Sequence, residues 1–355
     1  MRKALTGLAG LVVVVLGGVW LTGWLGANDE PHAYAPVTDE DRAAARAYLE
    51  RAHVPLPDGW RWSTFEREPG IPLRSGRVDV ADPKGIVVLV PGHTAPLDLH
   101  GLHVLELTTA GYSVAGLEQR GQGLSWRPLS NPEKSHQTDY ADLSADLAAY
   151  VASLGTDLPV FVLGTSMGGH IALRAAGENA MKPRAMGLVV PMVDIQTGAF
   201  PYPVARAITS FYAHTGLGAN YTPGAADWAM QDVSFGTPSA CNPNPDTADR
   251  LNALRVLDER LRVRGATNQW VHATMASVRR IREPAFLAAI DVPTFMVTAG
   301  REAYVSTPAA RAACDAMGSC TRRHFEEAAH CITNEDPARG AAILKEIAAF
   351  FDERL

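Results

Sequence analysis

The chain has 355 residues, of which 47% are hydrophobic, and a formal net charge of −6. This length can bury a large core, so one catalytic domain with an insertion accounts for the chain. Lysine and arginine are scattered and form no basic stripe, which argues against nucleic acid as a partner and leaves small or lipidic substrates.

The first segment is the most apolar part of the chain. Two basic residues precede an uncharged, mostly apolar run over residues 4–28, and two acidic residues follow it. Roughly 25 helical residues span the hydrocarbon layer of about 30 Å, whereas the apolar region of a cleaved signal has about 7 to 15. The length therefore favours a membrane anchor at residues 1–28, and the flanking charges predict a body outside the cytoplasm. A cleaved signal peptide and a secreted protein are the alternative.

Residues 29–59 are interpreted as a polar, alanine-rich segment that leads into the catalytic domain. A helix is predicted from Thr38 to Ala52, because Thr38 and Asp39 are suitable cap residues. No internal repeat or low-complexity segment follows.

Further along, apolar runs alternate with helical patterns. Buried strands are predicted at residues 85–90, 112–117, 160–163, 186–190 and 293–298. Because these runs are continuously apolar, we expect a mostly parallel sheet that helices cover on both faces. Helical patterns at residues 139–153 and 167–177 fill two of the intervals. This α/β core is assigned to residues 60–194 and 291–355.

Residues 195–290 interrupt the alternation. They contain no comparable strand, but they hold prolines, aromatic residues and helical patterns at residues 248–263 and 268–281. An insertion at this point would lie over the crevice at the carboxyl ends of the strands, where open α/β sheets bind ligands. We therefore interpret residues 195–290 as a helical cap that shapes the pocket.

The segment Gly-Thr-Ser-Met-Gly at residues 164–168 directly follows a predicted buried strand. This G-x-S-x-G pattern is typical of a nucleophile elbow, a sharp turn from strand to helix that raises the serine hydroxyl above the sheet. A structural glycine-rich turn is the alternative. The position between a buried strand and a helix favours Ser166 as a nucleophile.

A nucleophilic serine needs a histidine base and an acid that orients it, and in this arrangement the acid precedes the histidine. Glu302 follows a predicted strand, and His330 follows a short strand-like run and a small-residue loop. Asp194 is the alternative acid. His170 and His324 lie inside a helix pattern and a strand pattern, so we expect them to be packing residues.

These roles predict an acyl-enzyme mechanism. His330 would take the proton of Ser166 as that oxygen attacks an ester carbonyl, and Glu302 would stabilise the charged imidazole. Two backbone amides are expected to bind the oxyanion, those of Met167 and His93. The alternative for His93 is an ordinary loop histidine.

The four cysteines fit no zinc-binding spacing, so no metal site is expected. In an exported protein, Cys314 and Cys320 could form a disulfide that closes a short loop, and buried thiols are the alternative. Cys331 follows His330 directly, and we expect it to pack away from the site.

Four collinear segments, at residues 90–93, 119–125, 164–169 and 329–330, together resemble one branch of the α/β-hydrolases. This branch contains lysophospholipase L2 and the monoacylglycerol lipases, with a domain of the serine aminopeptidase S33 type. The resemblance covers roughly residues 60–353. It implies an eight-stranded sheet, a helical cap after the sixth strand, no cofactor, and hydrolysis of single-chain lipid esters. The sequence departs from the family at Pro91, where histidine is common, and at Glu302, where aspartate is usual.

The sequence therefore predicts a serine hydrolase of carboxylic esters, with lysophospholipids or monoacylglycerols as expected substrates. One alternative is a peptidase similar to proline iminopeptidase, which would bind an amine through acidic residues of the cap. The candidates for that cluster are Asp227, Asp232, Asp246 and Asp249. The other alternative is a catalytically silent binding module tethered to the membrane.

Overall fold

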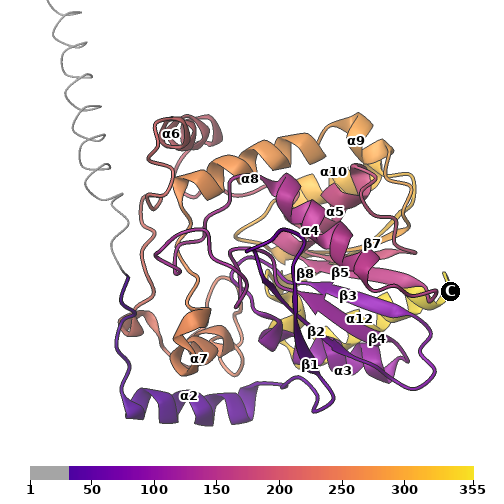
Figure 1. Ribbon diagram of the computed structural model, residues 1–355, viewed down its shortest axis with the longest axis horizontal. Coiled ribbons are helices and arrows are strands. Elements are labelled where there is room, and N and C mark those ends of the chain that lie inside the picture. Colours follow the sequence, from indigo (N-terminus) through magenta and orange to yellow (C-terminus); the bar gives the residue numbers. More distant parts are fainter. Residues whose placement is uncertain (1–31) are drawn as a thin grey trace, which may run out of the picture.

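The computed structural model describes residues 32–355, and an eight-stranded sheet forms its centre (Figure 1). The strands are β1 (Arg61–Phe65), β2 (Leu73–Val78), β3 (Ile86–Val90), β4 (Ser113–Leu117), β5 (Val160–Thr165), β6 (Met186–Val189), β7 (Thr294–Arg301) and β8 (Cys320–Ala329). Their order in the sheet is β1-β2-β4-β3-β5-β6-β7-β8. Only the pairs β1–β2 and β2–β4 are antiparallel. The mostly parallel sheet predicted from the sequence is confirmed.

Helices cover both faces of the sheet, because alternate side chains of the central strands face opposite sides. On one face, Val88 and Val90 of β3 pack in a cluster with residues of α4 (Tyr140–Ser153), α5 (Met167–Gly177) and α10 (Thr307–Ala316). On the other face, Val87 and Leu89 pack with residues of α3 (Gly101–Thr109) and α12 (Pro337–Asp352). The strands therefore need apolar residues at every position, which is why the predicted runs are continuous.

The segment before the core forms the predicted helix, α2 (Asp39–Ala52). Thr38 caps it by accepting a hydrogen bond from the Asp41 amide at 3.1 Å, and the Asp41 carboxylate accepts one from the Thr38 amide at 2.8 Å. The anchor predicted at residues 1–28 lies outside the described residues. Within residues 32–355, the helices are all too short or too polar to cross a membrane.

Between β6 and β7 lie the elements that we call the cap. They are α6 (Tyr202–His214), α7 (Arg250–Leu257), α8 (Asn268–Ile281), α9 (Pro284–Ala288) and short 3-10 helices at Met230–Asp232 and Glu259–Leu261. The helix predicted at residues 268–281 is α8. Figure 1 shows α6 and α8 on one side of the cap and α7 on the other, with α2 beside α7.

Two parts of the cap differ from the sequence prediction. The helix predicted over residues 248–263 ends at Leu257, because Asp258 has an extended backbone and its side chain accepts the Arg260 amide of a short 3-10 helix. Residues 215–249 contain no α-helix. Prolines and glycines recur through this segment and prevent a continuous helix.

The described chain contains two disulfides, Cys314–Cys320, which closes a short loop, and Cys241–Cys331, which joins distant parts of the chain. The first connects α10 with the start of β8, as predicted. The prediction that Cys331 is only a packing residue is wrong. The irregular cap segment returns to the edge of the sheet, where the Cys331 amide also donates to the Cys241 carbonyl at 2.8 Å.

Candidate active site

Ser166 occupies a sharp turn between β5 and α5. Its φ of 52° and ψ of −114° lie in a region that a serine adopts only when its surroundings enforce it. The glycines of the elbow allow this turn. A Cβ on Gly164 would lie 2.7 Å from the Gly168 carbonyl oxygen, and a Cβ on Gly168 would lie 2.0 Å from the Val90 carbonyl oxygen. Glycine is therefore needed at both positions, because the backbone passes too close for a side chain on either side of the serine.

The structure brings Ser166, His330 and Glu302 into one hydrogen-bonded chain. The His330 Nε2 lies 3.0 Å from the Ser166 Oγ, and the His330 Nδ1 lies 2.8 Å from the Glu302 Oε2. Glu302 and His330 follow β7 and β8, which are adjacent parallel strands. The alternative acid, Asp194, is paired with Arg282 of the cap instead.

Glu302 is held as a carboxylate. Its side chain is only 3% exposed, and its Oε1 accepts the backbone amides of Tyr304 at 2.8 Å and Val305 at 3.2 Å. Burial by itself raises the pKa of Glu302, but the hydrogen bond and charge of His330 and the two amides outweigh burial and lower it. A carboxylate at Nδ1 favours the imidazole tautomer whose Nε2 lone pair faces Ser166.

Backbone amides lie close to the nucleophile on two sides. Met167 is the first residue of α5, and amides in the first turn of a helix have no acceptor within that helix. The loop after β3 passes directly against the nucleophile, because a Cβ on Gly92 would lie 3.2 Å from the Ser166 Cβ. His93 follows Gly92 and lines the same cavity as Ser166. These are the positions that the sequence predicts for the oxyanion donors.

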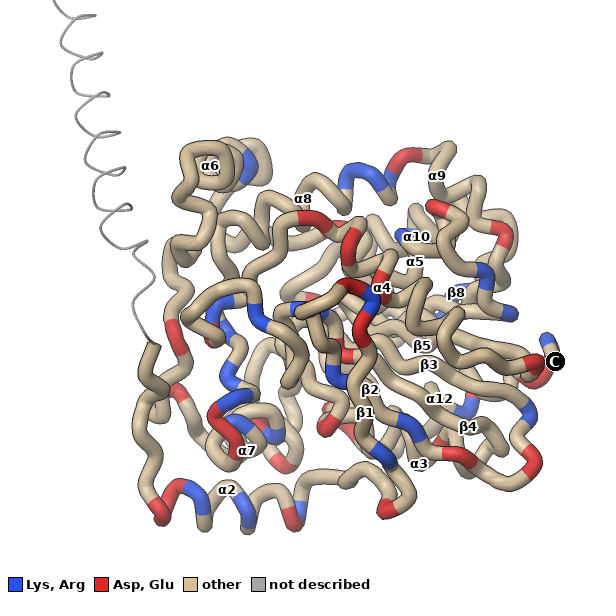
Figure 2. Tube along the Cα trace, viewed as in Figure 1, with Lys and Arg blue, Asp and Glu red and all other residues tan. Residues whose placement is uncertain are grey.

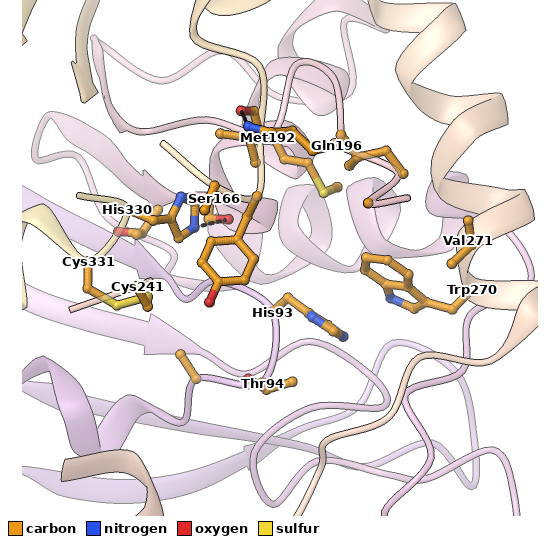
Figure 3. A pocket seen from close by; sticks show the side chains of 18 of the residues that line it. His93, Thr94, Ser166, Met192, Gln196, Cys241, Trp270, Val271, His330 and Cys331 are labelled. Atoms are coloured by element: carbon orange, nitrogen blue, oxygen red, sulfur yellow. Dashed lines mark hydrogen bonds between the residues drawn. A yellow bond between two sulfur atoms is a disulfide. The ribbon is translucent and has the colours of Figure 1, made fainter. Parts of the chain in front are cut away.

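The His93 imidazole itself is engaged elsewhere. It stacks on Trp270 with ring centroids 4.3 Å apart (Figure 3), and its Nε2 lies 2.6 Å from the Ser135 Oγ. Burial, with a smaller effect of the Arg255 charge, lowers the pKa of His93 to about 3. The ring is therefore neutral near pH 7, and it connects the loop after β3 to α8.

Two glutamines support the loop after β3. The Gln119 Nε2 donates to the Pro91 carbonyl at 2.9 Å, and the Gln122 Oε1 accepts the Thr94 amide at 2.7 Å. Thr94 has a φ of 62°, so this hydrogen bond holds a backbone conformation that threonine rarely adopts. Both glutamines belong to the segment at residues 119–125 that resembles the family, but the sequence predicted no role for them. Their contact with the loop could not be predicted from spacing.

A cavity of about 700 Å³ lies in front of Ser166, and residues of the cap line part of it. Many lining residues are apolar, among them Met192, Ile195, Phe200, Ala205, Ile208, Trp270, Val271 and Val305. None of the residues found to line it is an aspartate or glutamate, within the part of the chain that the structure describes. The acidic residues considered for an amine-binding cluster therefore lie outside the pocket.

Two residues that the sequence did not single out flank His330. The Tyr304 ring lies 5.2 Å from the His330 ring between centroids. Cys241 of the cap lines the pocket, and its disulfide to Cys331 lies beside His330 (Figure 3). Tyr304 could have been suspected because it is two residues from Glu302, but Cys241 is 90 residues from its partner.

One group with metal-ligand chemistry occurs within residues 32–355, and it is separate from the pocket lining. Ligand atoms of His32, Glu133 and Asp227 all lie within 4.8 Å of one another. The His32 Nε2 is 3.3 Å from Glu133 and the Nδ1 is 3.9 Å from Asp227. The two ring nitrogens of His32 therefore face different carboxylates.

The fold and the site together define a serine hydrolase of the α/β-hydrolase class, in its lipase and esterase branch. The chain belongs to the family described as serine aminopeptidase, S33, which it matches over residues 81–337.

Two curated relatives and one solved structure show the similarity. Lysophospholipase L2 of Escherichia coli strain K12 is 27% identical over 237 residues, which cover 64% of this chain and 68% of that protein. The monoacylglycerol lipase of Mycolicibacterium smegmatis is 31% identical over 129 residues, or 36% of this chain and 44% of that protein. A soluble variant of monoglyceride lipase from Saccharomyces cerevisiae, solved with a substrate analog, has a TM-score of 0.66 at 15% identity. The superposition covers 86% of this chain and 96% of the lipase chain. At this identity, the similarity is one of fold.

Proposed function

We propose that the protein hydrolyses carboxylic esters through an acyl-enzyme on Ser166. His330 takes the hydroxyl proton as the Ser166 Oγ attacks the ester carbonyl, and it returns the proton to the leaving alcohol. Water then attacks the acyl-enzyme, again with His330 as base, and releases the carboxylic acid. The observation that carries the proposal is the hydrogen-bonded chain from Ser166 through His330 to Glu302, at 3.0 and 2.8 Å.

The oxyanion of each tetrahedral intermediate is bound by the main-chain amides of Met167 and His93 in this proposal. Each such donor is typically worth about 3 kcal/mol of activation free energy. The support for His93 is the close approach of the loop after β3 to Ser166, together with the two glutamines that hold this loop.

The proposed substrates are single-chain lipid esters, lysophospholipids or monoacylglycerols. The apolar lining contributed by the cap suits an acyl chain. The names of two relatives, lysophospholipase L2 and monoacylglycerol lipase, point to the same two substrates. A peptidase similar to proline iminopeptidase is the second candidate, and the description of the S33 family favours it. Among residues 32–355, the pocket lining offers no carboxylate for a substrate amine, so the ester is preferred.

We further propose that the body lies outside the cytoplasm and is held there by a membrane anchor at residues 1–28. Support comes from the length and flanking charges of that segment and from the two disulfides, which persist in oxidising compartments. Mass spectrometry of the N-terminus of the mature protein tests the anchor. A start at or next to Met1 is expected, and a start near Asn28 would show a cleaved signal instead.

Hydrolysis of a substrate panel tests the enzymatic proposal. The panel contains p-nitrophenyl esters, a lysophospholipid, a monoacylglycerol and a proline arylamide, and the detergent-solubilised wild type is compared with Ser166→Ala. Ester hydrolysis by the wild type alone is expected. Equal rates for the two proteins would exclude Ser166 as the nucleophile, and cleavage of the arylamide without the esters would establish the peptidase.

A further inference from the structure

Side chains from two sides of the cap line the pocket. Apolar side chains of α6 and α8, such as Ile208 and Val271, line one end. Polar residues from α7, from the cap segment before it and from the short helix α11 (Ile332–Glu335) line the other, namely Asn242, Arg250, Thr333 and Asn334. Figure 1 shows α6 and α8 on the opposite side of the cap from α7. Thr209 of α6 and Asn268 of α8 also line the pocket, so the charge of Arg250 is what distinguishes the side around α7.

Arg250 is the one charged residue among those found to line this pocket, apart from histidines, in the described part of the chain. It is 4% exposed. Its guanidinium donates to two main-chain carbonyls, those of Ala52 at 3.3 Å and of Asn334. Asn334 lies in α11, four residues beyond His330, so the guanidinium is hydrogen-bonded to the helix that directly follows the proposed base.

Arg250 has no acidic partner within ion-pair distance among residues 32–355. Figure 2 shows basic and acidic residues interspersed along the chain. Within residues 32–355, the buried Arg255 and Arg262 also form no ion pair, but neither of them lines the pocket, and other arginines are paired with carboxylates. Arg120, which is 7% exposed, contacts the Asp146 carboxylate at 2.6 Å, and Arg74 contacts Asp98 at 2.6 Å. A buried guanidinium without a counter-charge has lost water and has gained only neutral acceptors in exchange.

The positive charge of Arg250 contributes to the lowered pKa values of two nearby histidines. Burial lowers the pKa of Arg250, and only the nearby Tyr48 opposes this effect. Burial and then the Arg250 charge lower the pKa of His53 to about 4. Burial, with a smaller effect of Arg250, also holds His100, which lines the pocket, at a pKa of about 4. An anion bound beside Arg250 would neutralise a positive charge that no carboxylate within residues 32–355 pairs with.

We propose that Arg250 forms an anion subsite that binds the phosphate of a lysophospholipid, so that the protein prefers lysophospholipids to monoacylglycerols. This inference rests on the proposed ester hydrolysis at Ser166. Three glycerol carbons separate the ester oxygen from the phosphate oxygen in such a substrate, and the head group lies on the leaving-group side of the ester. The acyl chain then occupies the end lined by α6 and α8. A guanidinium suits this task because it remains charged and donates two parallel hydrogen bonds to one phosphate.

Arg255 provides a matched control. It lies in the same helix, is equally buried, and donates to the carbonyls of Leu261 and Val263, but it does not line the pocket. Replacing Arg255 removes a buried guanidinium from the cap without removing one from the pocket. A general loss of cap packing therefore affects both variants, whereas loss of the subsite affects only Arg250.

The test compares full-length wild type, Arg250→Met, Arg250→Lys and Arg255→Met on 1-palmitoyl lysophosphatidylcholine and 1-monopalmitoylglycerol. The expected result is that Arg250→Met lowers kcat/KM for the lysophospholipid about 10- to 100-fold more than for the neutral ester, mainly through KM. Arg250→Lys should recover part of this loss, and Arg255→Met should change kcat/KM for both substrates by the same factor. Equal factors for both substrates in Arg250→Met, or a wild type that prefers the neutral ester, would overturn the subsite.

Competition experiments separate this inference from the proposed function. sn-Glycerol 3-phosphate should inhibit p-nitrophenyl butyrate hydrolysis by the wild type, whereas glycerol and succinate should inhibit it more weakly. Inhibition by succinate at lower concentrations than by the phosphate would overturn the phosphate assignment in favour of a carboxylate. If no ester is hydrolysed at all, the proposed function fails. Calorimetric binding of sn-glycerol 3-phosphate to wild type and Arg250→Met then still decides the subsite.

Discussion

Cys241 of the cap is covalently bonded to Cys331, the residue that follows His330, so the cap and the proposed catalytic base are parts of one cross-linked unit. The disulfide closes a separation of 90 residues, whereas Cys314–Cys320 closes one of six. In the chain-entropy description, a cross-link lowers the conformational entropy of the unfolded chain. For these two loop lengths, the free energy of the unfolded chain rises by about 5 and about 2 kcal/mol, respectively. The two bonds therefore differ both in their expected effect on stability and in their distance along the chain from His330.

Removal of the first disulfide should reduce both activity and stability. We expect Cys241→Ser combined with Cys331→Ser to lower ester kcat/KM about 100-fold, because the loop that carries His330 loses its attachment to the cap. Urea unfolding and steady-state kinetics measure the two effects. Cys314→Ser combined with Cys320→Ser is the control and should lose stability while keeping most of the activity. Equal activities of the two double variants would show that the cross-link does not position His330.

Glu302→Gln tests the acid. A glutamine is isosteric with glutamate but cannot stabilise an imidazolium, so kcat should fall about 10³- to 10⁴-fold with little change in KM. Asp194→Asn removes the alternative acid and should retain activity within about tenfold. A larger loss in Asp194→Asn than in Glu302→Gln would reverse the assignment.

The lowered pKa of Glu302 also predicts a pH dependence of stability. A carboxyl group whose pKa is lower in the folded than in the unfolded state stabilises the fold above its ordinary pKa of 4.5. This contribution is lost as the pH falls through the lowered folded value. The free energy of unfolding, measured by urea titration at pH 7 and at progressively lower pH, should therefore decrease more in the wild type than in Glu302→Gln. Parallel decreases would show that Glu302 is not coupled to folding.

His93→Phe separates the main chain of His93 from its side chain. The backbone amide remains, and a phenyl ring can still stack on Trp270, so kcat/KM should stay within about tenfold of the wild type. The Ser135 hydroxyl keeps a second partner, because the Gln122 Nε2 lies 3.2 Å away. Steady-state hydrolysis of a p-nitrophenyl ester is sufficient for this test. A loss as large as that of Ser166→Ala would mean that the imidazole takes part in the reaction.

Gly168→Ala tests the packing of the elbow. The added methyl group would lie 2.0 Å from the Val90 carbonyl oxygen, so β3 and α5 would have to separate. We expect a loss of about 2 kcal/mol or more in the free energy of unfolding, together with most of the activity. Gly318→Ala is the control, because a Cβ at that position meets no atom within 4 Å. Equal stability of the two variants, measured by urea unfolding, would contradict the close approach.

Several features could be predicted from the sequence because they depend on local pattern. The runs that form β3 and β5 are apolar at every position, since both faces of these strands are buried. β1 was not predicted, because its residues are almost all exposed and it is held by backbone pairing at the edge of the sheet. Ser166, Glu302 and His330 could be selected because each follows a strand at the same edge of a parallel sheet.

Other features depend on contacts between distant segments. The bond between Cys241 and Cys331 required the path of residues 215–249, which no periodicity describes. The same is true of Arg250. Only the structure shows that it is buried, lines the pocket and has no acidic partner among residues 32–355. Spacing along the chain predicted the proposed triad, but it could not predict the position of the arginine that we propose as the phosphate subsite.

Covalent labelling with a fluorophosphonate, followed by peptide mapping, tests the central claim most directly. The account predicts one phosphonyl group per chain, located on Ser166, with complete loss of ester hydrolysis at full labelling. Ser166→Ala should remain unlabelled, and His330→Ala should be labelled far more slowly. A label on another residue, or ester hydrolysis that persists in fully labelled protein, would contradict the account.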